Sequence, residues 1–154
     1  MQGPKLLQLL TILHLALTGG ATIFVLVAYF VHHQGMEVDE SMATILVPLS
    51  LAMAAGGVLA GQMMYKQGLA RISADQPMEK RLEAYKGVFI LRLALIEGPA
   101  LFGAVVHMIT GSIWGLGISI CLIAWMVMLR PTADGVAMDL GLSPGERKAF
   151  LEEE

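Results

Sequence analysis

Four long apolar stretches constrain the fold of this 154-residue chain more than any other feature of its sequence. They cover about residues 6–31, 42–65, 86–110 and 113–130. A helix rises about 1.5 Å per residue, so about 20 apolar residues cross a hydrocarbon core of about 30 Å. Membrane-spanning strands would need segments of about 10 residues with alternating polarity, and the sequence contains none. The pattern therefore predicts an all-α membrane protein with four transmembrane helices.

The distribution of lysine and arginine predicts the orientation of these helices. Basic residues precede the first stretch, follow the fourth and fill the loop between the second and third, whereas the other two loops contain none. Since cytoplasmic loops carry the excess of positive charge, both termini and the central loop should be cytoplasmic. We expect a multi-pass protein of the cell inner (plasma) membrane, with a single transmembrane domain over residues 1–154 and a cytoplasmic tail at 131–154.

Two further patterns concern how the chain is organised. Ser143-Pro144-Gly145-Glu146 combines a Ser cap, a Pro at the first helical position and a Glu three residues after the cap, which predicts a short cytoplasmic helix from Pro144 to about Glu152. The segment Ile12–Gly20 resembles Ile90–Gly98, and both halves of the chain run in the same direction. We therefore expect the four helices to form two parallel-repeated hairpins.

The second apolar stretch is rich in small residues. One face carries them at spacings of four and three residues, and Gly57-x-x-x-Gly61 is a motif that lets two helices approach closely. This face should pack against another helix, either within the bundle or from a second copy. Its residues are Ser50, Ala54, Gly57 and Gly61.

Glu97 is the strongest candidate for a functional residue. It lies about 12 residues after Tyr85, or about 18 Å into the membrane, where a charge is costly and a carboxyl group is expected to be neutral at rest. Pro99 cannot donate a backbone hydrogen bond, so the carbonyl of Leu95 is left free at similar depth. Glu97, this carbonyl and Arg92 form a candidate site for a proton or small cation. In the alternative interpretation, Glu97 only donates a hydrogen bond to a neighbouring helix.

Histidines form a second candidate group, and enzyme signatures are absent. His32, His33 and His107 fall at a similar depth near the outer surface, which would allow a haem or metal ion between helices, although their spacing matches no metal-binding motif. We therefore expect no cofactor. The sequence lacks a Walker A motif, a nucleophile elbow and a C-x-x-C pair, so we do not expect an enzyme.

Motifs in the second and third stretches also suggest a family. They are, in chain order, Gly57-x-x-x-Gly61, Gly68-Leu69-Ala70-Arg71, Pro77 and Ala94-Leu95-Ile96-Glu97-Gly98-Pro99-Ala100-Leu101-Phe102-Gly103. Together they resemble the c-subunit proteolipid of rotary ATP synthases. The resemblance implies that the loop at Arg71 meets a partner and that Glu97 binds the translocated proton or sodium ion. In that family the hairpin begins and ends outside, whereas here it is flanked by two further helices.

These observations predict a small integral membrane subunit of a larger or homo-oligomeric membrane complex, which handles a proton or cation through Glu97. The alternatives are a structural or accessory subunit without ion transport and a haem- or metal-bearing membrane anchor. The expected partners are the lipid bilayer and other membrane subunits or copies of the same chain, with no nucleic acid.

Overall fold

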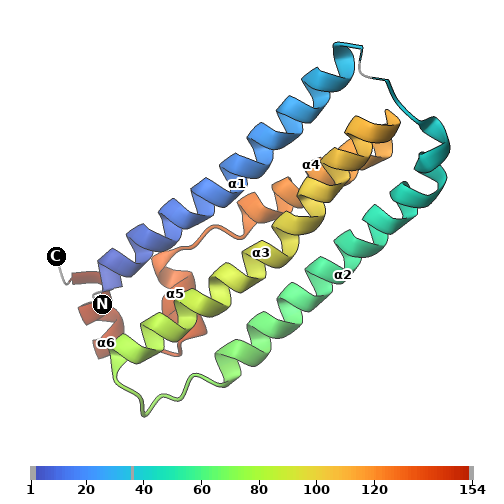
Figure 1. Ribbon diagram of the computed structural model, residues 1–154. Coiled ribbons are helices and arrows are strands. Elements are labelled where there is room, and N and C mark those ends of the chain that lie inside the picture. Colours follow the sequence, from blue (N-terminus) through green and yellow to red (C-terminus); the bar gives the residue numbers. More distant parts are fainter. Residues whose placement is uncertain (1–2, 36, 153–154) are drawn as a thin grey trace.

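The computed structural model describes residues 3–35 and 37–152, and within these ranges the chain is helical and contains no strand. Four long helices form an antiparallel bundle, and two short helices follow it (Figure 1). Their bounds are α1 Gly3–His33, η1 Glu40–Met42, α2 Ala43–Ala70, α3 Met78–Thr110, α4 Ile113–Met128, α5 Ala133–Asp139 and α6 Pro144–Glu152.

Three helices are long and apolar enough to cross a membrane, namely α1, α2 together with η1, and α3. The fourth candidate is the pair α4 and α5, with a bend of 82° between them. α4 has 16 residues and is about 24 Å long, which is shorter than a typical hydrocarbon core. The first three helices run beyond the predicted apolar stretches, and the predicted tail contains α5, which the sequence did not indicate. The last two positions of that tail lie outside the described residues.

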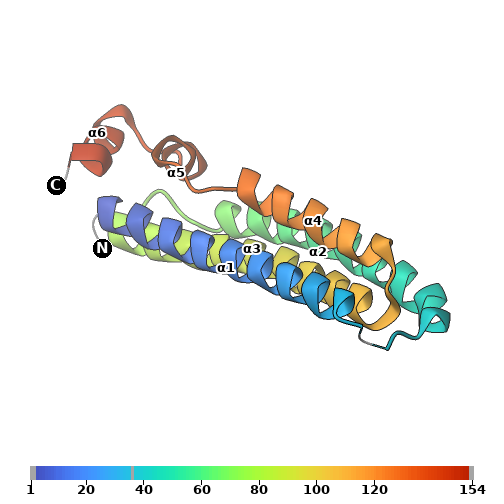
Figure 2. The same ribbon diagram turned by 90° about the horizontal axis from the view of Figure 1, so that it is seen from above.

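α3 lies at the centre of the bundle. It packs against α1, α2 and α4, and α4 also contacts α1 and α2. α1 and α2 lie on opposite sides of α3, and α4 covers a third side (Figures 1 and 2). The N-terminus, the α2–α3 loop, α5 and α6 gather at one end of the bundle (Figure 1). This is the arrangement that four spans with both termini on one side require.

Small residues allow the helices around α3 to approach closely. A Cβ atom added to Gly103 on α3 would lie 2.6 Å from Ser119 Oγ and 2.8 Å from the carbonyl oxygen of Gly115, both on α4. Ser119 Oγ donates a hydrogen bond of 2.6 Å to the carbonyl of Ala100, which joins the two helices further. Gly111 makes the tight turn between them possible, because its φ of 69° is a left-handed conformation that glycine adopts without strain.

The two segments of the predicted repeat lie on α1 and α3, which are neighbours and run in the same direction. Leu10 of α1 clusters with Phe89 of α3, and Val25 clusters with Ala104. Both pairs are separated by 79 positions, close to the 78 that separate Ile12 from Ile90. Matched positions of the two segments therefore lie at similar heights in the bundle. The duplication itself remains a prediction.

Candidate functional site

Glu97 lies near the middle of α3, on the side that faces α1. Leu93, Glu97 and Ala104 follow each other at spacings of four and seven residues, so they share one side of the helix. Leu93 clusters with Leu10 of α1, and Ala104 clusters with Val25. Glu97 itself is half-buried, and its carboxyl group has no hydrogen-bond or ion-pair partner among the described residues. It therefore lies at the margin of the α1–α3 contact.

The two groups predicted to join Glu97 face α2 instead. A Cβ atom added to Gly57 would overlap the carbonyl oxygen of Leu95 and lie 2.9 Å from Cγ of Pro99. Gly57 therefore packs directly against this carbonyl. The Nη2 atom of Arg92 donates a hydrogen bond of 3.0 Å to Gln62 Oε1 on α2. The structure therefore does not bring Glu97, Leu95 and Arg92 together in one ion site.

The small-residue face of α2 lies against α3 and α4. A Cβ atom added to Gly61 would lie 3.3 Å from the carbonyl oxygen of Arg92, and Ala54 is buried in a cluster with Ile96 of α3 and Leu122 of α4. Ser50 is fully buried, and its hydroxyl donates to the carbonyl of Val47 on its own helix. This face is therefore occupied by helices of the same chain.

A polar network that the sequence analysis missed holds α5 against the bundle. Asp139 Oδ2 accepts hydrogen bonds from the hydroxyl groups of Tyr65, at 2.5 Å, and of Tyr85, at 3.2 Å. These hydroxyl groups lie 3.1 Å apart, and the guanidinium of Arg92 stacks 4.3 Å from the centre of the Tyr65 ring. Three helices, α2, α3 and α5, therefore meet at one carboxylate.

A second contact holds α6. Arg81 of α3 is almost fully buried, and it donates to Glu146 Oε1 at 3.0 Å and to the carbonyl oxygen of Leu140 at 2.5 Å. Glu146 also accepts a hydrogen bond from the backbone N–H of Ser143. The Ser143 hydroxyl accepts one from the backbone N–H of Glu146, so the two residues form a reciprocal helix cap. These contacts, together with the buried side chain of Phe150, place α6 against the ends of α1 and α3.

His32, His33 and His107 lie close together at the C-terminal ends of α1 and α3. The rings of His32 and His107 are 4.8 Å apart, and Nδ1 of His107 is 3.1 Å from the carbonyl oxygen of Ser112. His33 Nδ1 is 3.2 Å from the carbonyl of Tyr29 instead. Within residues 3–35 and 37–152, no three His, Cys, Asp or Glu side chains are placed to hold a metal ion.

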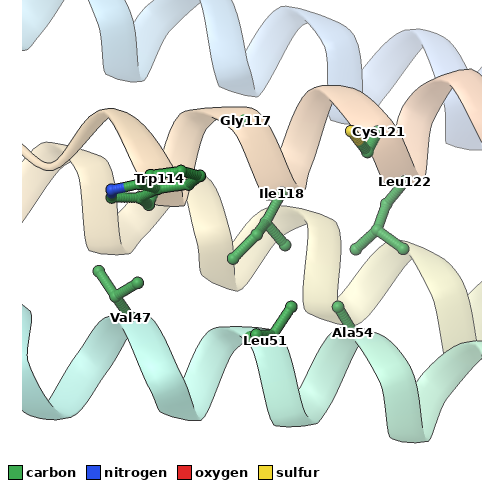
Figure 3. A pocket seen from close by; sticks show the side chains of 8 residues that line it. All are labelled: Val47, Leu51, Ala54, Trp114, Gly117, Ile118, Cys121 and Leu122. Atoms are coloured by element: carbon green, nitrogen blue, oxygen red, sulfur yellow. The ribbon is translucent and has the colours of Figure 1, made fainter.

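An apolar groove of about 570 Å³ lies between α2 and α4 (Figure 3). Val47, Leu51 and Ala54 of α2 face Ile118 and Leu122 of α4 across it. Its lining is almost entirely apolar, and the polar side-chain atoms in it are the thiol of Cys121 and the indole nitrogen of Trp114 (Figure 3).

Comparisons with known proteins found no match for this chain. No family model matches it, and neither a curated protein nor a solved structure does so.

Proposed function

We propose that the chain is a four-span protein of the cell inner membrane, with both termini and the α2–α3 loop in the cytoplasm. Support comes from the side chains that the bundle leaves uncovered: large apolar residues along the outer sides of α1, α2 and α4 are exposed, among them Ile45 and Leu59, each 71% exposed. Exposed apolar surface on this scale favours lipid contact. In the proposed topology α4 is a short fourth span, and α5 bends away from it and lies at the interface between the membrane and the cytoplasm.

Within that membrane, we propose that the protein is a subunit of a larger or homo-oligomeric complex and that Glu97 is its functional residue. One observation carries this proposal: the Glu97 carboxyl group is half-buried in the middle of a span and has no partner among the described residues. A charge at the bilayer centre costs about 2.5–3.5 kcal/mol or more, so such a group needs a partner, a proton or an aqueous path. At the margin of the α1–α3 contact, Glu97 is accessible to a group from another chain.

The chemistry that fits best is the binding and release of a proton. A dehydrated metal cation needs several oxygen ligands, but the Leu95 carbonyl, the second oxygen expected at this site, faces Gly57 instead. A single carboxyl group at the edge of the bundle can still carry a proton. This role agrees with the one that the resemblance to the c-subunit proteolipids implies for Glu97.

The second candidate is an accessory subunit in which neutral Glu97 donates a permanent hydrogen bond to another chain. It is favoured by the network around Asp139, which fixes α5 to the bundle and is typical of a rigid structural module.

Labelling with a lipophilic carbodiimide in native membranes distinguishes the two candidates, because the reagent needs a carboxyl group that is accessible from the lipid and exchanges protons. Proton handling predicts that Glu97 is labelled, that Glu97→Gln loses the label and that Glu97→Asp keeps it. Glu83→Gln is the matched control, since Glu83 is an exposed carboxylate at the cytoplasmic end of the same helix. An unlabelled Glu97 in intact membranes, which becomes reactive only after the complex is dissociated, would favour the accessory role.

A further inference from the structure

We draw no further inference here: the strongest candidate, the imidazole pair of His32 and His107 between the C-terminal ends of α1 and α3, carries none, because its two unpaired nitrogens are enclosed by protein and no third His, Cys, Asp or Glu side chain within residues 3–35 and 37–152 is placed to complete a metal site with them.

Discussion

Replacing Gly57 with alanine should weaken the contact between α2 and α3. The added Cβ would overlap the carbonyl oxygen of Leu95 and lie 2.9 Å from Pro99 Cγ, and neither a backbone carbonyl nor a proline ring can easily move away. Overpacking of this kind costs about 1–3 kcal/mol. Alanine also gains up to about 1 kcal/mol in helix propensity over glycine, which offsets part of the cost.

Gly56→Ala separates the cost of the clash from the gain in helix propensity. Gly56 is the preceding residue on the same helix, and a Cβ atom added to it would meet no atom within 4 Å. It gains the same propensity without a clash, so the difference between the two variants measures the clash alone. We expect Gly57→Ala to be less stable than Gly56→Ala by about 1–3 kcal/mol.

The free energy of unfolding in detergent micelles, followed by circular dichroism, provides the comparison. The size-exclusion profile of each variant confirms that it stays monodisperse. Equal stability of Gly56→Ala and Gly57→Ala would refute the close packing of Gly57 on Leu95 from which the cost is derived.

Three further outcomes follow from the structure. Asp139→Ala leaves two tyrosine hydroxyls without their shared acceptor and should lower the free energy of unfolding by about 1–3 kcal/mol, whereas Asp134→Ala, which breaks only an exposed ion pair, should cost less than about 1 kcal/mol. The hydrogen bonds from Ser143 hold the pKa of Glu146 below its ordinary value of 4.5, so the stabilisation of α6 is complete above that pH and is lost as the pH falls through the lower value of the folded state. The protection factors of residues 144–148 in hydrogen exchange, which are corrected for the intrinsic pH dependence of exchange, should therefore fall in acid, and Glu146→Gln should remove this dependence. Cys121, the single cysteine, lines the apolar groove and should resist a sulfonated maleimide in intact membranes and react after the protein is unfolded in SDS.

The sequence predicted the helices well because the length and polarity of a membrane span are local properties. Each apolar stretch contains enough information to define a helix without knowledge of its neighbours. The α4–α5 bend was harder to predict. Pro131 stops a helix there, but the direction in which the chain continues depends on contacts with α2 and α3.

The polar network at the end of the bundle that carries α5 and α6 could not be predicted from the sequence, because its members are far apart in the chain. Tyr65 and Asp139 are separated by 74 positions, and Arg81 and Glu146 by 65. It was predictable, however, that the Leu95 carbonyl and the Glu97 side chain face different neighbouring helices. The carbonyl of Leu95 points along the helix toward Pro99, and residues two apart on a helix, such as Glu97 and Pro99, lie about 200° from each other, so this carbonyl and the Glu97 side chain do not readily share one site.

The oligomeric state of the protein tests the central claim most directly. Gentle detergent extraction from native membranes, followed by native mass spectrometry, gives the mass of the assembly that contains Glu97. We predict either a homo-oligomer or a complex of defined stoichiometry with other membrane subunits, in which another chain lies beside the α1–α3 margin. A monomer at every detergent concentration, with Glu97 inert to carbodiimide, would contradict the account.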